Sequence, residues 1–228
     1  MSKRPAIGTL QERSLHASLK ELYCTGDAKT EVQIDGFVVD VVKGGLLIEI
    51  QTRNFAAIKN KLRTLFKVYP VRLVHALPRR KWIVKETSDG STQLSRRLSP
   101  KSCGFEDIFD ELVRIPSFII HSNFSIEVLL IDEEEIRRKD GMGSWRRRGW
   151  SIVDRRLIEV IDRRVYETPS DFLHFIPDSL EKPFTNSDLV NALDISRRLG
   201  QKLTYSLRKM NALKIVGKRG NALLHDIM

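Results

Sequence analysis

The sequence feature that most constrains the fold is a pair of short apolar runs joined by the turn Lys43-Gly44-Gly45. Two such runs around a Gly-Gly turn predict a β-hairpin, because glycine adopts the backbone angles that a tight turn requires. Asp40 ends the first run, and Glu49 and Gln51 end the second. Side chains at i and i+2 of a strand point the same way, so the hairpin brings two carboxylates and an amide to one place.

Such a cluster of oxygen ligands suits Mg²⁺ or Mn²⁺, which leave coordination positions open for phosphate oxygens. A metal ion held there lowers the pKa of a bound water and neutralises charge on a phosphodiester. The alternative is a hairpin that carries ordinary surface acids, because short motifs occur by chance.

These residues resemble the PD-(D/E)xK nuclease superfamily, whose fold is the restriction-endonuclease-like α/β fold. That family places an acid in an N-terminal helix, then an Asp, then an acid-x-Lys triplet on the next strand, then a helix. Glu12, Asp40 and the triplet Glu49-Ile50-Gln51 follow this order. The resemblance covers about the first 130 residues and implies that Glu12, Asp40 and Glu49 hold the metal ion.

The triplet departs from the family pattern because Gln51 stands where most members carry Lys. The missing ammonium removes a group that positions the attacking water or stabilises negative charge. Some restriction enzymes that resemble this pattern cleave with Gln, which implies that Gln51 orients water or a phosphate oxygen. An inactive descendant that only binds DNA is the alternative.

The composition favours a polyanionic partner and a cytoplasmic protein. The formal net charge is +10, which does not itself distinguish DNA, RNA and a membrane surface. No apolar run approaches the ~20 residues that span a bilayer, and the N-terminal segment lacks a signal-peptide pattern. Cys24 and Cys103 are too few and too far apart for a zinc site or a disulfide framework.

Hydrophobic periodicity predicts alternating helices and strands, as an α/β sandwich requires. The expected helices are 9–23, 56–66 and 105–113, with the lysines and arginine of the second facing outward. The expected strands are 30–34, 37–42, 46–51, 71–76, 82–85 and 125–131, with a polar loop at 86–101.

A basic segment follows the predicted nuclease-like domain, which is assigned to residues 1–135. Residues 137–164 contain ten Arg or Lys and four Asp or Glu. Within the segment, Trp145 and Trp150 bracket Arg146, Arg147 and Arg148. Arginines neutralise phosphates and indoles stack on unpaired bases, so we predict a nucleic-acid contact. The alternative is a structural loop whose tryptophans anchor it and whose arginines pair with the glutamates of residues 133–135.

The remaining segments are assigned to a connector, residues 136–182, and to a second domain, residues 183–228. The second domain is predicted to contain two helices, then a hairpin with a basic turn, which is the order of a winged helix-turn-helix. Residues 196–220 contain eight Lys or Arg and no acid. The predicted DNA contacts are Arg197, Arg198, Lys202, Tyr205, Arg208, Lys209, Lys218 and Arg219.

Together these patterns predict a metal-dependent DNA endonuclease whose winged helix binds the duplex. Three alternatives stay open: a catalytically silent DNA-binding regulator, an RNA-binding or RNA-processing protein, and a winged helix that contacts protein. A homodimer is expected if both strands are cut, because such nucleases often pair two active sites.

Overall fold

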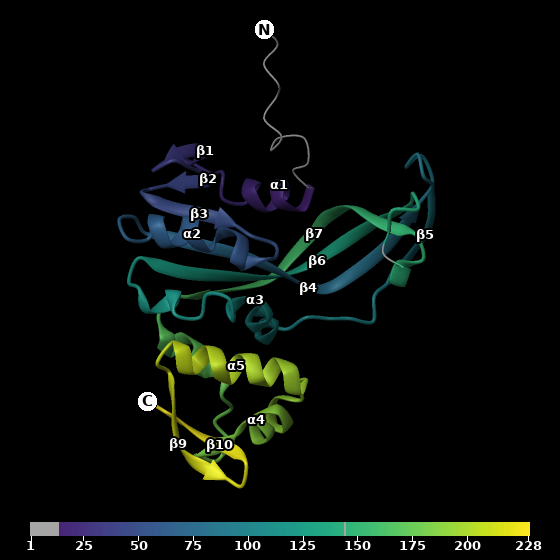
Figure 1. Cartoon of the computed structure of the whole chain (residues 1–228). Helices are drawn as coiled ribbons and strands as arrows, with labels where there is room; N and C mark the ends of the chain where they lie inside the picture. Colours follow the sequence, from purple (N-terminus) through teal and green to yellow (C-terminus); the bar gives the residue numbers. More distant parts are fainter. Residues whose placement is uncertain (1–13, 144) are drawn as a thin grey trace.

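The computed structural model describes residues 14–143 and 145–228, and its main body is a mixed sheet flanked by helices (Figure 1). The strands lie in the order β1-β2-β3-β4-β6-β7, and β5 pairs with β4. Strands β3, β4 and β6 are mutually parallel, whereas β1, β2, β5 and β7 pair antiparallel to their neighbours. The predicted α/β class is therefore confirmed.

The first half of the sheet forms a three-stranded meander followed by a helical crossover to β4. Its elements are α1 (Ser14–Glu21), β1 (Lys29–Ile34), β2 (Phe37–Lys43), β3 (Leu46–Ile50) and α2 (Phe55–Leu65). The predicted hairpin and the helix that follows it are confirmed. Gly44 and Gly45 both have positive φ values, which explains the Gly-Gly pair at this turn.

The second half consists of long strands that extend beyond the body as an arm, defined as residues 79–86, 93–98, 132–139 and 145–157 (Figure 1). The strands are β4 (Val71–Glu86), β5 (Gln93–Leu98), β6 (Phe124–Lys139) and β7 (Trp150–Tyr166). Short helices lie between or after them: η1 (Phe105–Ile108), α3 (Phe109–Leu112), η2 (Phe118–Ile120), η3 (Trp145–Arg147) and η4 (Pro169–Phe175).

Three of the predictions for this half were wrong. The strands expected at 71–76 and 82–85 are one strand, whose register shifts between Pro78 and Arg80. The polar loop expected at 86–101 contains β5. The strand expected to end at Ile131 continues to Lys139, because the acids beyond it are buried in ion pairs. Much of the predicted connector therefore belongs to the sheet as β7.

The C-terminal unit, residues 184–227, contains two helices and a three-stranded antiparallel sheet. Its elements are β8 (Phe184–Thr185), α4 (Asn186–Leu193), α5 (Arg197–Lys209), β9 (Leu213–Arg219) and β10 (Ala222–Ile227). The strands lie in the order β8-β10-β9. The side chain of Thr185 accepts a hydrogen bond from the backbone N–H of Asp188, and the carboxylate of Asp188 accepts one from the N–H of Thr185, so a capping box begins α4.

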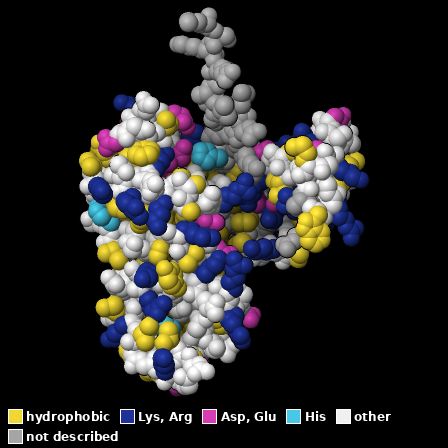
Figure 2. All heavy atoms as spheres, viewed as in Figure 1, with side chains coloured by type: hydrophobic (Ala, Val, Ile, Leu, Met, Phe, Trp, Pro, Cys, Tyr) yellow, Lys and Arg dark blue, Asp and Glu magenta, His cyan; other side chains and the backbone are white. Residues whose placement is uncertain are grey.

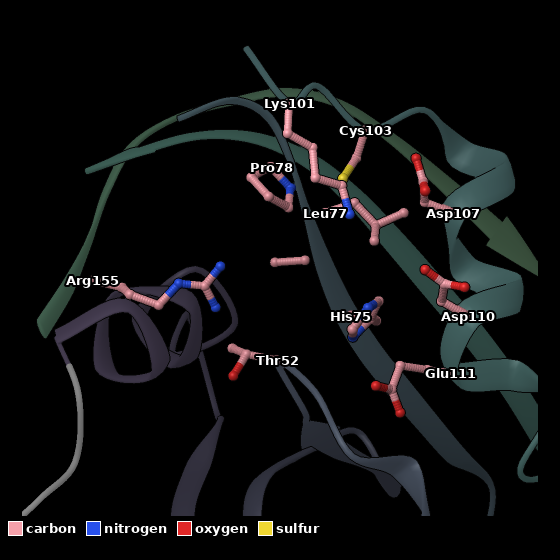
Figure 3. Close-up of a pocket in the computed structure, with 11 residues that line it drawn as sticks. Thr52, His75, Leu77, Pro78, Lys101, Cys103, Asp107, Asp110, Glu111 and Arg155 are labelled. Atoms are coloured by element: carbon pink, nitrogen blue, oxygen red, sulfur yellow. The ribbon is translucent and has the colours of Figure 1, made fainter. Parts of the chain in front are cut away.

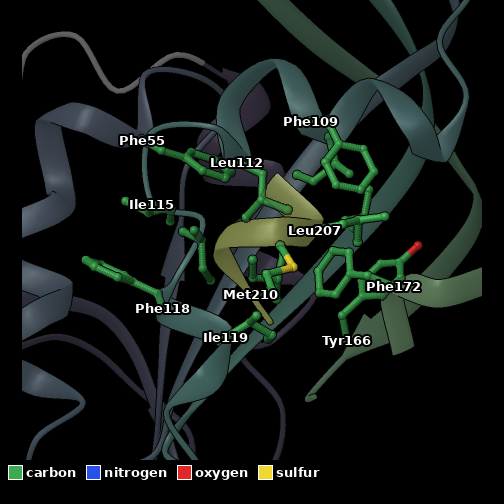
Figure 4. Close-up of a cluster of buried hydrophobic side chains, with 14 of the residues drawn as sticks. Phe55, Phe109, Leu112, Ile115, Phe118, Ile119, Tyr166, Phe172, Leu207 and Met210 are labelled. Carbon is green, nitrogen blue, oxygen red and sulfur yellow. The ribbon is translucent and has the colours of Figure 1, made fainter. Parts of the chain in front are cut away.

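Two apolar clusters cover the two faces of the main sheet. The smaller one packs Leu15 and Leu19 of α1 against one face. The larger one covers the opposite face with residues of α2 and α3, and continues without interruption into α4 and α5 (Figure 4). Phe109 of α3 and Leu207 of α5 are both fully buried in it. The C-terminal unit and the main sheet therefore share one hydrophobic core. Among the described residues, no helix is long and apolar enough to cross a membrane.

Candidate functional site

Strands β2 and β3 separate beside the two predicted carboxylates. Their pairing begins at the turn and ends at Val41 opposite Ile48. Beyond that point the carboxylate of Asp40 accepts a hydrogen bond from the backbone N–H of Ile50 at 2.8 Å. In a regular antiparallel pair a backbone carbonyl oxygen of the neighbouring strand would accept this bond. Glu49 lies between Ile48 and Ile50, and the opening of the hairpin therefore places Asp40 beside it.

The carboxylate of Glu49 is buried and contacts a lysine that comes from α2. Only 3% of Glu49 is exposed, and the Nζ atom of Lys61 lies 2.6 Å from each of its carboxylate oxygens. Only the contact to Oε2 has hydrogen-bond geometry, and Oε1 is buried without a hydrogen-bond partner among the described residues. Lys61 also donates to the carbonyl oxygen of Val38, so the ammonium is held at the gap between the strands.

Lys61 was expected to face outward, and the structure corrects that expectation. Its side chain is 17% exposed because Lys61 follows Ile58 by three residues and precedes Leu65 by four, which places it at the border of the buried face of α2. The ammonium that the triplet lacks at Gln51 is thus supplied from the following helix. Its helical spacing from two apolar residues was the available sequence signal.

The environment drives the pKa values of the two carboxyl groups apart. Burial raises the pKa of Glu49 to about 7, against the opposing effect of Lys61, and the charge of Asp40 adds to the increase. Burial also acts to raise the pKa of Asp40, but hydrogen bonds from His16 and from the N–H of Ile50 outweigh it, and the net shift is downward. Asp40 is therefore ionised at neutral pH, while Glu49 exchanges its proton near pH 7.

His16 of α1 completes the described part of the site and was not predicted. Its Nε2 atom lies 3.1 Å from the carbonyl oxygen of Ile50 and 3.5 Å from Oδ2 of Asp40. Glu12, the predicted helical ligand, lies outside the described residues.

Gln51 makes contacts at the start of α2. Its side-chain Nε2 donates to the carbonyl oxygen of Asn54 at 3.1 Å, and its own backbone oxygen accepts from Nδ1 of His75 at 2.6 Å. Within the described part of the chain, no hydrogen bond joins Gln51 to Asp40 or Glu49. The amide therefore fixes the loop between β3 and α2, and Asp40, Glu49 and Lys61 form the centre of the site.

The oxygen atoms of this centre fit the ligand preference of Mg²⁺ or Mn²⁺. Asp40 and Glu49 supply carboxylate oxygens, and Ile50 supplies a backbone carbonyl oxygen. Oε1 of Glu49 is buried and makes no hydrogen bond among the described residues, but Nζ of Lys61 lies 2.6 Å from it, so a metal ion at Oε1 would have to take the place of this ammonium. Residues 14–143 and 145–228 contain no group of three or more His, Cys, Asp or Glu side chains that could hold a metal ion.

The end of the arm carries the predicted Trp and Arg residues, and the two tryptophans differ. Trp145 is 83% exposed, whereas the ring of Trp150 lies 4.5 Å from Nζ of Lys85 on β4. Arg147 donates to the backbone oxygen of Trp150, and Arg148 is exposed. The side chain of Arg146 lies outside the described part of the structure.

Among the described side chains, the glutamates of residues 133–135 do not pair with Arg147 or Arg148, which the structural alternative had expected. Glu133 pairs with Arg155 and Glu134 with Arg96, each at 2.7 Å. Glu135 pairs with Arg137 and with Lys81. The acids therefore hold the strands of the arm together, while Trp150 anchors the loop as the same alternative expected.

The predicted basic residues of the C-terminal unit fall into exposed and ion-paired groups. Arg197, Arg198 and Lys209 are exposed on α5, and Lys218 is exposed on the hairpin. Tyr205, the uncharged predicted contact on α5, is exposed as well. Arg208 is half-buried. Lys202 pairs with Asp110 of α3 at 2.7 Å, and Arg219 pairs with Asp188 of α4 at 3.0 Å. Figure 2 shows dark-blue Lys and Arg side chains gathered between the main sheet and the C-terminal unit.

Comparison with known proteins places the main sheet in a family. The model of the family described as a domain of unknown function, DUF8091, matches residues 13–167, which run from the start of α1 to the end of β7. The chain belongs to this family. The DUF8091 domain thus contains the whole mixed sheet, the arm, and the site formed by Asp40, Glu49 and Lys61.

The chain is also similar to an uncharacterized protein of Treponema pallidum (strain Nichols). The two are 29% identical over 212 residues, which cover 89% of this chain and 84% of that protein. A stretch of that length extends beyond the DUF8091 domain, so the similarity includes part of the C-terminal unit. No solved structure matches the chain.

Proposed function

We propose that the protein is a metal-dependent nuclease that hydrolyses phosphodiester bonds of DNA on a restriction-endonuclease-like sheet. One observation carries the proposal: Asp40, Glu49 and Lys61 come from three elements and meet where β2 and β3 separate. A buried carboxylate, that of Glu49, beside the half-buried carboxylate of Asp40 and an ammonium is costly to maintain for stability alone, and such sites are often functional.

The chain's own residues have distinct parts in this proposal. Asp40, Glu49 and the carbonyl of Ile50 would hold Mg²⁺ or Mn²⁺, which supplies an activated water and neutralises charge on the phosphate. Lys61 releases Glu49 and turns its ammonium toward the phosphate oxygens. His16, within 3.5 Å of Asp40, keeps that carboxylate in place or donates a proton to the leaving oxygen.

We further propose that the C-terminal unit is a winged helix that positions duplex DNA. The order α4, α5, β9, β10, with β8 completing the sheet, supports this assignment. Along α5, Arg197, Tyr205 and Lys209 are exposed at spacings of eight and four residues, which places them on one side of the helix. The shared core fixes this side relative to the main sheet, so bound DNA would have one orientation at the site.

The proposal is tested by incubating the protein with plasmid, branched and single-stranded DNA, and with RNA, in Mg²⁺, Mn²⁺ or EDTA. Metal-dependent nicking or cleavage that stops in EDTA is expected, with DNA cut in preference to RNA. Tight DNA binding without cleavage in either metal would instead identify a binding protein on a nuclease-like sheet. Preferred cleavage of RNA would show that the substrate is RNA and not DNA.

Replacing Lys61 with Met is expected to lower the cleavage rate by about a hundredfold, because an ammonium that stabilises transition-state charge contributes roughly 3 kcal/mol. DNA affinity should change by less than twofold, as one charge near the metal contributes little to it. The comparison is made by single-turnover kinetics, with the protein in saturating excess over the DNA.

Lys59→Met provides the matched control, since Lys59 lies on the same helix and has no ion pair within the described structure. Equal cleavage rates in the two variants would contradict a catalytic part for Lys61.

Replacing Arg147 and Arg148 with Gln is expected to weaken DNA binding and to flatten its salt dependence. Each lost phosphate contact reduces the slope of log affinity against log salt by roughly 0.9, so the two replacements together reduce it by up to about 1.8. Fluorescence anisotropy over a salt series measures the slope. Lys29 and Lys67, exposed on β1 and after α2, give a charge-matched double variant that should keep the wild-type slope.

A further inference from the structure

A cavity of about 150 Å³ lies next to the loop that joins β3 to α2 (Figure 3). Thr52 of this loop, His75 of β4, Glu111 of α3 and Arg155 of β7 all line it. His75 donates from Nδ1 to the backbone oxygen of Gln51, so a wall of the cavity is bonded directly to the loop. The β3–α2 loop, β4, α3 and β7 thus all line this cavity, which does not include Asp40, Glu49 or Lys61.

One wall of the cavity consists of three carboxylates, each held in place through one oxygen. Asp107 accepts from the backbone N–H of Gly104 at 3.0 Å, and Glu111 accepts from the N–H of Phe55 at 3.0 Å. Asp110 accepts from Lys202 at 2.7 Å. The other carboxylate oxygens are left to accept hydrogen bonds from a ligand that carries N–H donors.

Cationic and apolar groups line the rest of the cavity. Arg155 lies across from the acidic wall (Figure 3). Its Nη2 atom pairs with Glu133 at 2.7 Å, and its Nε is buried without a hydrogen-bond partner among the described residues, so Nε is the donor left for a ligand. Leu77, Pro78 and Cys103 add apolar surface, and burial raises the pKa of the Cys103 thiol to about 11, so it stays protonated. The cavity therefore offers acceptors on one side, a cation on the other, and apolar contact.

The size of the cavity restricts the ligand to one small ring system. A cavity of about 150 Å³ accommodates a single aromatic ring. A nucleobase with an exocyclic amino group has N–H donors, a ring nitrogen or carbonyl acceptor, and a flat apolar face. Thr52 follows Glu49 by three residues, so at ~3.3 Å per residue the cavity begins within roughly 10 Å of the metal centre, a distance of one or two nucleotides.

We propose that this cavity binds one unpaired, amino-bearing nucleobase of the strand that occupies the adjacent site. The proposal rests on the proposed nuclease function for the identity of the strand, and it adds a base-binding subsite to it. The carboxylates accept hydrogen bonds from the amino group of the base, and Arg155 donates a hydrogen bond to its ring nitrogen or carbonyl oxygen. The base must therefore be unstacked from its neighbours in the strand.

The test uses cytidine 5′-monophosphate and uridine 5′-monophosphate, which differ at an amino group that only the former carries. Each is titrated into ¹⁵N-labelled protein in EDTA and followed through backbone amide shifts. The amides of Thr52, Ala76 and Cys103 should shift with the cytidine nucleotide at about tenfold lower concentration than with the uridine nucleotide, since a hydrogen bond to a charged group is lost with the latter. Ribose 5-phosphate should leave these amides unshifted.

Two variants of one residue separate the cavity from other binding surfaces. Cys103→Met fills the cavity and should abolish the shifts caused by the cytidine nucleotide, whereas Cys103→Ser leaves the space open and should retain them. Equal shifts with ribose 5-phosphate, no shift at the cavity amides, or unchanged shifts in Cys103→Met would each overturn the proposal. The titration needs no hydrolysis, so a protein that binds the nucleotide but does not cleave DNA would refute the nuclease function and not the subsite.

Discussion

Replacement of Glu49 with Gln is expected to reduce metal-dependent cleavage about a thousandfold while DNA affinity stays the same or rises. The amide keeps the shape of the side chain but removes a charged metal ligand, and a loss of roughly 4 kcal/mol in transition-state stabilisation corresponds to that factor. Affinity does not fall, because one source of repulsion from phosphate disappears. Single-turnover cleavage and anisotropy in EDTA measure the two quantities separately.

The same variant is expected to respond to pH differently from the wild type. Since the pKa of Glu49 in the folded chain is about 7 against an ordinary 4.5, the folded state binds the proton more tightly than the unfolded state. The wild type should therefore lose stability as pH rises from about 4.5 through 7, by up to about 3 kcal/mol, relative to Glu49→Gln.

Glu21→Gln, an exposed replacement on α1, serves as the control for both measurements. Cleavage by Glu49→Gln at the wild-type rate would show that this carboxylate takes no part in the mechanism. A variant that fails to fold at any pH would show that Glu49 has a structural part.

Replacement of Leu207 with Ala is expected to destabilise the whole chain by about 2–5 kcal/mol. Leu207 is fully buried in the cluster that joins α5 to α3, and a large-to-small change there loses apolar contact and leaves a cavity. The three tryptophans are Trp82, Trp145 and Trp150, which all lie in or next to the arm of the main sheet. Their fluorescence therefore reports unfolding of the sheet in response to a change in the C-terminal unit.

Gln201→Ala on the same helix is exposed and should change the free energy of unfolding by less than about 0.5 kcal/mol. A tryptophan transition that is unchanged in Leu207→Ala, while the C-terminal unit unfolds earlier, would show that the two parts unfold independently.

The sequence predicted the hairpin that carries Asp40 and Glu49 because its signals are local. A Gly-Gly turn and two apolar runs determine the pairing, and pairing determines which side chains are neighbours. The helices and the hairpin of the C-terminal unit were predicted for the same reason, since capping residues and helical spacing lie within a few positions of one another.

The arm was missed because its stability depends on contacts between distant residues. Glu133 and Arg155 are 22 positions apart, and in the sequence each looks like a solvated charge. The first part of strand β7, residues 150–156, was also missed, because the register against β6 shifts at Val153. The shift inserts one residue and breaks the alternation that identifies a strand.

Lys61 was missed for a different reason. Helical spacing places it at the edge of the apolar face, but only the crossover from β3 through α2 to β4 brings that edge over Glu49. A search limited to the acid-x-amide triplet would not find it.

The most direct test of the central claim is isothermal titration of Mn²⁺ or Mg²⁺ into the wild type and into Asp40→Asn. The two-carboxylate site predicts saturable binding to the wild type that is lost in the variant, together with retained folding as judged by tryptophan fluorescence. Identical titrations of the two proteins would contradict a metal site between β2 and β3.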